Sequence, residues 1–512
     1  MENLIRAIQN ICQYLNVNTN EVQIYERSYN KVGKCHFIMF NMIHSKYLLV
    51  AGQGRLFDEI NGESIFTCKI CPLSHANRLI LNKYLDYTVP KAFGPNVATF
   101  GVGDRLGITS PAHIKALANS GIRPVLAQQS KRELNLTGRS YDEILDSACF
   151  AVIQEGYREG FGADGDHLKD EKDIESAIKS GVSMITLDCS DRINYSVESI
   201  DADELNDLYE KLPVGVRTYY ESTYLNQEFK IADIAYVFSK DILVRNVLIY
   251  DQVIEFIENI FETHILSCDR KIDFEISLDE TLNATSLYGH LLVALEIEKR
   301  NIEISSMAPR FVGEFQKGVD YIGNIEDFEK NIVEHAHLAD HFGYKLSIHS
   351  GSDKFSVFNA IGQATKGRFH IKTSGTSWLE AVKVISEVNP ELYRKMHQYA
   401  LLHFEEAKAY YHVSANLLAI ENIETVSDRK LSEFLEKNDS RQLMHITYGL
   451  ILNAKEDGKF IFRDEIFSTL GQFMKQYEEA IVKHISKHVD LLVDSTKMYL
   501  SFSLPFELKQ LA

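Results

Sequence analysis

Apolar residues recur in short runs along the middle of this chain, and most runs are followed by an amphipathic stretch. The runs lie at residues 97–102, 123–127, 160–163, 183–187, 273–278, 303–307, 345–348 and 368–371. Between them, stretches such as 111–120 and 325–341 carry apolar residues at helical spacing, and several of these stretches end at Gly. Strands that alternate with helices in this way are typical of a parallel sheet covered by helices.

Eight such alternations predict a closed barrel as the fold class. We expect an α/β protein with a (β/α)8 TIM-like barrel over residues 91–390, and a doubly wound sheet is the weaker alternative. Residues 1–90 predict a small N-terminal α+β extension. Helical periodicity predicts a helical insertion at 191–265, after the fourth strand, and a helical C-terminal region at 391–512.

Polar residues gather where the predicted strands end. Enzymes with this fold place their chemistry at the carboxyl ends of the strands. Asp166 and His167 follow the third strand, and His349 follows the seventh. The alternative for the third strand end is a helix start, where Asp164 or Asp166 caps backbone amides.

Two imidazoles at one barrel mouth indicate a metal site. His167 and His349, with an oxygen donor, suit zinc, manganese or a similar divalent ion and leave a position for substrate oxygens. Gln316, Glu314 and Asp166 are the candidates for the third donor.

Asp166 and Glu275 are the candidate catalytic acid and base. In 273–279, alternation turns Glu275, Ser277 and Asp279 into the barrel, where burial raises the pKa of a carboxyl group. The alternative for Glu275 is a buried ion pair with Lys372 or Arg310.

An anionic substrate needs local positive charge, because the formal net charge of the chain is -18. The candidate substrate-binding residues at the strand ends are Arg105, Gln129, Arg310, Lys317, Lys354 and Lys372. The acidic surface argues against a nucleic acid or an anionic membrane as partner, and a homo-oligomer stays open.

Seven cysteines in 512 residues do not indicate a disulfide framework, and the expected compartment is the reducing cytoplasm. The pair Cys68 and Cys71 has CxxC spacing, but it lies in an apolar run that we interpret as helical. Core thiols are therefore favoured over a zinc or redox pair. We expect the first residues to form an amphipathic helix rather than a signal peptide, and no apolar run is long enough to predict a membrane span.

Several long phrases resemble the tagaturonate/fructuronate epimerases, a family of hexuronate C4-epimerases. They are 100–107 (FGVGDRLG), 127–139, 155–169 (EGYREGFGADGDHLK), 308–323 (APRFVGEFQKGVDYIG) and 345–355 (KLSIHSGSDKF). The resemblance implies a metal-dependent barrel that interconverts D-tagaturonate and D-fructuronate, with metal and acid/base positions at Asp166, His167, Glu275, Gln316 and His349. The family often has Glu where this chain has Gln316.

The residues fit this chemistry in their own right. The C4 hydrogen of a 2-ketose acid is not adjacent to the ketone, so enolisation cannot release it. A metal-bound enediolate can instead form when the C3–C4 bond breaks and re-forms, which is retro-aldol/aldol chemistry. Direct proton or hydride transfer at C4 is the mechanistic alternative. The rival functions are a metal-dependent (class II-like) sugar aldolase and a non-catalytic sugar-binding or assembly subunit.

Overall fold

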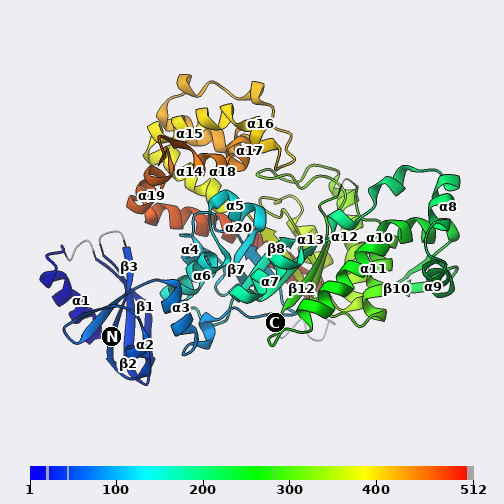
Figure 1. The fold of residues 1–512 in the computed structure, drawn as a ribbon. Coiled ribbons are helices and arrows are strands. Elements are labelled where there is room, and N and C mark those ends of the chain that lie inside the picture. Colours follow the sequence, from blue (N-terminus) through cyan, green and yellow to red (C-terminus); the bar gives the residue numbers. More distant parts are fainter. Residues whose placement is uncertain (19–21, 43–44, 282, 504–512) are drawn as a thin grey trace.

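The protein is built around a closed barrel of eight parallel strands, seen in a computed structural model that describes residues 1–18, 22–42, 45–281 and 283–503 (Figure 1). The strands are β6 (Thr99–Val102), β7 (Arg123–Ser130), β8 (Gly162–Leu168), β9 (Met184–Asp188), β12 (Asp273–Leu278), β13 (Ser306–Pro309), β14 (Lys345–Ile348) and β15 (Phe369–Thr373). Pairing of β15 with β6 closes the ring, so the expected barrel is confirmed and the open sheet is wrong.

Strand alternation separates an apolar outside from a polar inside. In β12, Phe274, Ile276 and Leu278 belong to the large apolar core between strands and helices. Glu275 of the same strand is fully buried but contacts polar groups of neighbouring strands. The apolar faces stabilise the barrel against its helices, and the interior is free to carry charged groups.

Helices surround the strands. After the strands come α4 (Ser110–Leu117), α5 (Lys131–Thr137), α6 (Tyr141–Glu155), α7 (Glu171–Ser180), α11 (Leu287–Lys299), α12 (Ile325–Phe342), α13 (Phe358–Ala364) and α14 (Thr376–Val388). Local caps define many of them. For example, Ser140 and Glu143 form a capping box at the start of α6, and Gly156 ends it in a left-handed conformation.

The N-terminal extension is an antiparallel sheet with three helices. The sheet order is β1-β2-β3-β5-β4, from β1 (Gln23–Val32), β2 (Lys34–Met42), β3 (Ser45–Gln53), β4 (Glu63–Ile65) and β5 (Cys68–Pro72). The helices are α1 (Glu2–Tyr14), α2 (Arg55–Glu59) and α3 (His75–Asn82). Cys68 and Cys71 therefore lie in a strand, and the helical interpretation was wrong because so short an apolar run fits either element. Both are buried free thiols.

The insertion after β9 is mostly helical, as expected, but it also contains a hairpin. Its longer helices are α8 (Ala202–Glu210), α9 (Val214–Tyr224) and α10 (Lys240–Ile260). The hairpin joins β10 (Glu228–Ile231) and β11 (Ile234–Val237), which are too short for a clear alternating pattern. The insertion extends away from the barrel on the right of Figure 1.

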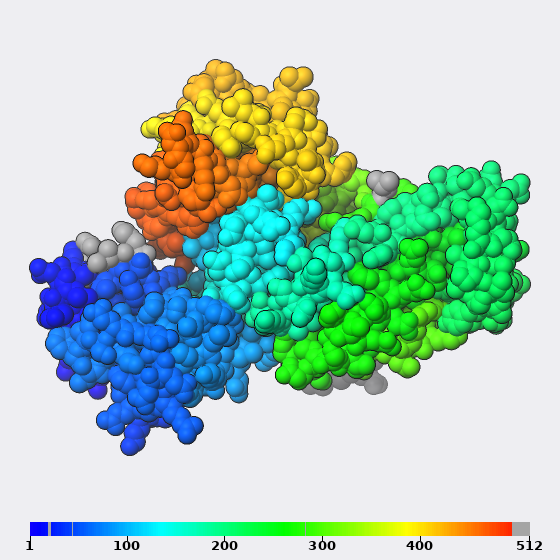
Figure 2. Space-filling model, in the orientation of Figure 1, coloured from blue at the N-terminus to red at the C-terminus, as the bar shows by residue number. Residues whose placement is uncertain are grey.

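The C-terminal region packs over one end of the barrel and along its side. Its helices include α15 (Pro390–Leu402), α16 (Phe404–Lys408), α17 (Asn438–Ile446), α18 (Tyr448–Asn453), α19 (Arg463–Gln472) and α20 (Met474–Ser503), with a short hairpin of β16 (Lys455–Glu456) and β17 (Lys459–Phe460). Helix α20 contacts α4, α13 and α14. Figure 2 shows this region against the barrel, away from the insertion. Among the described helices, none combines the length and apolarity needed to cross a membrane.

A buried histidine in α15 makes stability depend on pH. His397 is fully buried, neither ring nitrogen has a hydrogen-bond partner, and burial lowers its pKa to about 4. Below about pH 6.5 the unfolded chain binds a proton at His397 that the folded chain does not bind. This residue therefore destabilises the fold progressively as the pH decreases from 6.5 toward 4 and has little effect above that range. We expect His397→Leu to gain about 2 kcal/mol relative to the parent between pH 7.5 and pH 5.

Chemical denaturation of both proteins at the two pH values measures this gain. The exposed His341 provides the matched control, His341→Leu. An equal gain in both variants, or none in His397→Leu, would contradict the assignment.

Candidate functional site

A cavity of about 330 Å³ opens at the carboxyl ends of the barrel strands. Its lining combines strand ends with the segment after α16, which contributes Tyr410, Tyr411 and His412. The volume falls in the range typical of small-molecule sites. The C-terminal helical region thus provides part of the cavity wall.

A β-bulge brings two consecutive polar residues of β8 to this cavity. The pairing of β8 with β9 shifts register between Gly165 and Leu168, and His167 has φ 53°. Without the shift, alternation would turn Asp166 and His167 to opposite faces. Both instead line the cavity.

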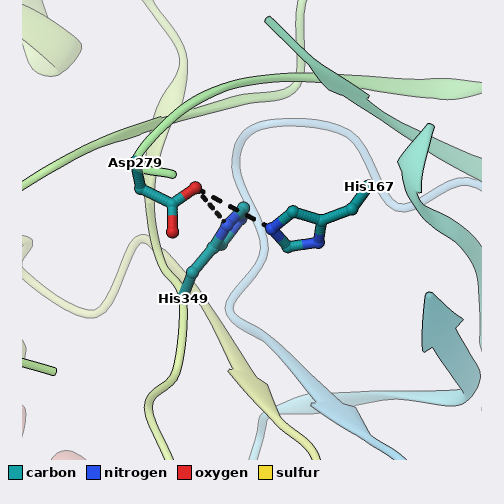
Figure 3. Close-up of side chains that lie close together, drawn as sticks. All are labelled: His167, Asp279 and His349. Carbon is teal, nitrogen blue, oxygen red and sulfur yellow. Dashed lines mark ion pairs between the residues drawn. The ribbon is translucent and has the colours of Figure 1, made fainter. Parts of the chain in front are cut away.

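His167, Asp279 and His349 form a candidate metal centre (Figure 3). One ligand atom from each lies within 4.8 Å of the other two. Asp279 Oδ1 is 2.7 Å from His349 Nδ1 and 3.9 Å from His167 Nε2. His349 Nδ1 is buried without a hydrogen bond of acceptable geometry. Two imidazoles and one carboxylate are a donor set that suits zinc or a similar divalent ion, so the residues fit a metal.

A second carboxylate holds the far nitrogen of each imidazole. Asp166 Oδ1 lies 2.7 Å from His167 Nδ1, and Glu275 Oε1 lies 2.8 Å from His349 Nε2. Such contacts fix the tautomer and the orientation of metal-binding histidines. They leave His167 Nε2 and His349 Nδ1 directed at Asp279.

Lys372 connects these carboxylates inside the barrel. Its Nζ lies 2.8 Å from Asp164 Oδ2, 2.8 Å from Asp166 Oδ1 and 2.9 Å from Glu275 Oε1, and it also donates to Thr186. The ion pair considered for Glu275 therefore exists with Lys372. Glu275 does not line the cavity, but its partners Lys372 and His349 do.

The pKa values reflect this crowding of charge. Burial disfavours the charged forms of Asp166 and Glu275, but the neighbouring cations lower the pKa of both carboxyls well below the ordinary range. Burial raises the pKa of Asp164 to about 6, against the attraction of Lys372. Burial also opposes a proton on His167, yet Asp166 raises the pKa of that imidazole to about 10. The centre attracts positive charge, which is what a cation site requires.

Gln316, a predicted third metal donor, uses its carbonyl oxygen in hydrogen bonds within the protein. Gln316 lines the cavity, but its Oε1 accepts hydrogen bonds from the backbone of Ser414 and from Gln442 Nε2, each at 3.0 Å. Both lone pairs of that carbonyl are thus in use. Glu314 also lines the cavity and pairs with Arg310 at 3.3 Å. Asp279 provides the carboxylate that the two imidazoles share.

Three predicted substrate-binding residues lie outside the cavity lining. Arg105 is buried beside Glu133, with Nη2 2.6 Å from Oε1, and stacks on Tyr448. Lys354 donates to three backbone carbonyl oxygens, and burial lowers its pKa to about 7. Gln129 is buried, with neither amide atom hydrogen-bonded. Arg105 and Lys354 therefore stabilise the surrounding loops.

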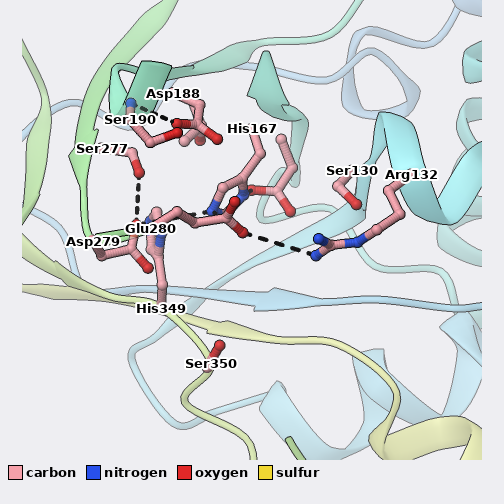
Figure 4. Close-up of polar contacts among 12 residues, drawn as sticks. Ser130, Arg132, His167, Asp188, Ser190, Ser277, Asp279, Glu280, His349 and Ser350 are labelled. Carbon is pink, nitrogen blue, oxygen red and sulfur yellow. Dashed lines mark hydrogen bonds and ion pairs between the residues drawn. The ribbon is translucent and has the colours of Figure 1, made fainter. Parts of the chain in front are cut away.

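The other three predicted residues, Arg310, Lys317 and Lys372, do line the cavity. Sequence reasoning missed Arg132 and Glu280, which face each other across the cavity at 3.8 Å (Figure 4). The inward alternation of β12 had already pointed to Asp279, so its role could have been found. Arg132 lies in the first turn of α5, two residues after β7 ends, and this closeness to a strand end is the signal that could have found it.

A second group of acidic and imidazole side chains lies where the loop after β14 meets α20. Asp353, in the loop after His349, pairs with Arg441 at 2.7 Å and with His484 Nε2 at 2.6 Å. His488 Nε2 accepts the backbone N–H of Asp353 at 3.0 Å. The carboxylate of Asp353 is thus already paired with two cationic or hydrogen-bonding side chains of the protein. These contacts attach α20 to the loop that carries His349.

Comparison with known proteins shows close relatives over most of the chain. A family model described as tagaturonate epimerase matches residues 25–492. The tagaturonate/fructuronate epimerase of Thermotoga maritima is 40% identical over 479 residues, which cover 92% of this chain and 97% of that protein.

Solved structures agree with the sequence comparison. A glycerol complex of the fructuronate-tagaturonate epimerase of Cohnella laeviribosi has a TM-score of 0.92 and 51% identity, covering 95% of this chain and 99% of that one. The native structure of the same protein has the same score and identity, covering 94% and 99%.

Loss of the Lys372 ammonium would leave three buried carboxylates without their shared cation. We expect Lys372→Met to lower the free energy of unfolding by about 3–5 kcal/mol, because an uncompensated buried charge is costly. Urea denaturation measures the loss. Lys395→Met, which breaks only an exposed pair with Glu391, is the control and should change little. Equal effects would show that Lys372 does not neutralise the interior.

Proposed function

This chain belongs to the tagaturonate epimerase family, and from that premise we propose that it interconverts D-tagaturonate and D-fructuronate by inverting C4. The 40% identical relative from Thermotoga maritima is a tagaturonate/fructuronate epimerase. The single observation that carries the proposal is the cavity that places His167, Asp279 and His349 beside Asp166 and a set of cationic side chains.

The proposed cofactor is a divalent metal ion, zinc, manganese or similar. His167 Nε2, His349 Nδ1 and Asp279 would hold it, because these atoms converge while the opposite ring nitrogens are held by Asp166 and Glu275. When bound, such an ion supplies Lewis-acid stabilisation of negative charge on substrate oxygens.

Asp166 is the proposed general base. It lines the cavity, its Oδ1 lies 2.7 Å from His167 Nδ1, and its Oδ2 accepts a hydrogen bond from Gln128 at 3.2 Å. Its lowered pKa keeps it ionised, which is the form that accepts a proton from the C4 hydroxyl. Glu275 does not touch the substrate directly in this proposal. It orients His349 and pairs with Lys372, which also pairs with Asp166.

The proposed reaction breaks and re-forms the C3–C4 bond. Asp166 takes the C4 hydroxyl proton, the C4–O bond becomes an aldehyde carbonyl, and the C3–C4 electron pair moves into an enediolate over C2 and C3. The aldehyde fragment turns, C3 attacks its other face, and Asp166 returns the proton to the new C4 hydroxyl. Atoms and electrons balance without an oxidant, and the substrate and product differ only at C4.

Turnover of a uronate tests the function directly. We expect metal-loaded protein to convert D-tagaturonate into a mixture with D-fructuronate, and a chelator to abolish the conversion. His349→Ala should lower kcat/KM by about a hundredfold or more, because a ligand to the Lewis acid is lost. Chromatographic separation of the two uronates measures the conversion. Accumulation of three-carbon fragments without the epimer would instead indicate an aldolase.

Metal affinity tests the role assigned to Glu275. We expect Glu275→Gln to weaken metal binding by about 10–100-fold, because the carboxylate that orients His349 is lost. Titration against a chromogenic chelator gives the dissociation constant. Glu296→Gln is the control, since Glu296 is equally buried but pairs with tyrosines of the insertion. Unchanged affinity in Glu275→Gln would contradict the positioning role.

A further inference from the structure

The cationic side chains that line the cavity differ in how far they are already paired. Lys372 contacts three carboxylates. Arg310 donates to the carbonyl oxygen of Thr281 and pairs with Glu314. These two cations are neutralised by the protein itself and have little capacity left for a substrate anion.

Lys317 is in a different situation. It is half-buried in the cavity wall, and its Nζ donates a hydrogen bond to Ser350 Oγ at 2.9 Å. Among the described residues, no carboxylate oxygen lies within 4.0 Å of this ammonium group. Burial and the nearby charge of Arg132 lower the pKa of Lys317. An ammonium group under these conditions is stabilised by an anion in the cavity.

Arg132 faces the same cavity from the start of α5. Its guanidinium stacks over the ring of Tyr411 at 4.7 Å and donates to the carbonyl oxygen of Tyr410 at 3.3 Å. The distance from Nη2 to Glu280, 3.8 Å, exceeds that of a hydrogen bond, so this terminal nitrogen keeps its donor capacity. The C-terminal region therefore fixes the plane of the guanidinium and leaves donor capacity for an oxygen ligand.

We propose that Lys317 and Arg132 bind the C6 carboxylate of the ketohexuronate and tether the carboxylate-bearing fragment while it turns between its two faces. The proposal rests on the function proposed above and assigns the end of the substrate that lies away from the metal centre. A planar guanidinium and an ammonium group together match the two oxygens of a carboxylate.

The chemistry explains why a tether is needed. Cleavage of C3–C4 leaves C1 to C3 as an enediolate and C4 to C6 as an aldehyde that carries the carboxylate. The second fragment has no covalent link to the first until C3 attacks it again. A carboxylate held by Lys317 and Arg132 gives that fragment a fixed pivot, so C4 can present its other face without leaving the cavity.

Ser350 links the two ends of the site. It follows His349 directly and accepts the hydrogen bond from Lys317. This hydrogen bond fixes the ammonium group of Lys317 relative to the end of β14, next to His349. The distance between the carboxylate site and the metal centre is set by β14 and its loop.

Two variants test the tether, Lys317→Met and Arg132→Gln. We expect each to lower kcat/KM for D-tagaturonate by about 10–100-fold, mostly through KM, because a charge-assisted contact is lost. Activity on an uncharged ketohexose, D-tagatose, should change by less than about threefold, since that substrate has no carboxylate to lose. Trapping with a hydrazine reagent should reveal three-carbon aldehyde acid released by the variants in excess of the parent.

Controls separate this role from a structural one. Lys317→Arg retains the charge and should recover at least part of KM. Lys131→Met, beside Arg132 but paired with Asp173 at 2.6 Å, should behave as the parent. Equal losses on the charged and uncharged sugars, or unchanged KM and no released fragment in both variants, would overturn the tether. Failure of the parent to epimerise the uronate would instead refute the proposed function.

Discussion

The ammonium group of Lys372 is the contact on which the interior of this barrel depends. Three carboxylates from two other strands, Asp164, Asp166 and Glu275, approach it within 2.9 Å. Charges so deeply buried are tolerated only when they are paired and hydrogen-bonded. One cation cannot neutralise three anions, and burial raises the pKa of Asp164 despite Lys372, with Asp166 and Glu275 adding to the rise.

That excess charge organises the site above it. Asp166 and Glu275 use their remaining capacity on His167 and His349, which fixes both rings with one nitrogen toward Asp279. The interior therefore both positions the imidazoles and favours a cation between them. The same two carboxylates that pair with Lys372 also orient His167 and His349. The orientation of the imidazoles and the negative potential between them therefore have one cause.

Segments outside the barrel complete the cavity. The C-terminal region brings Tyr410 and Tyr411 to the wall, and Tyr411 supports Arg132 from below its guanidinium plane. Helix α20 attaches to the loop after His349 through His484 and Asp353. The barrel alone would thus present the metal centre, whereas the opposite end of the site needs residues that are distant in sequence.

The sequence by itself predicted eight strands and the pair His167 and His349, because periodicity and strand-end chemistry are local properties of the chain. Closure of the barrel was decided by the pairing of β15 with β6, which are distant in sequence. The sequence did not determine the partner of each charge. Lys354 donates to three backbone carbonyl oxygens, whereas Lys317 lines the cavity, although both follow strand ends and have the same side chain. Only the tertiary structure decided this, since a charge is neutralised by whatever lies within a few ångströms of it, and those neighbours come from distant parts of the chain.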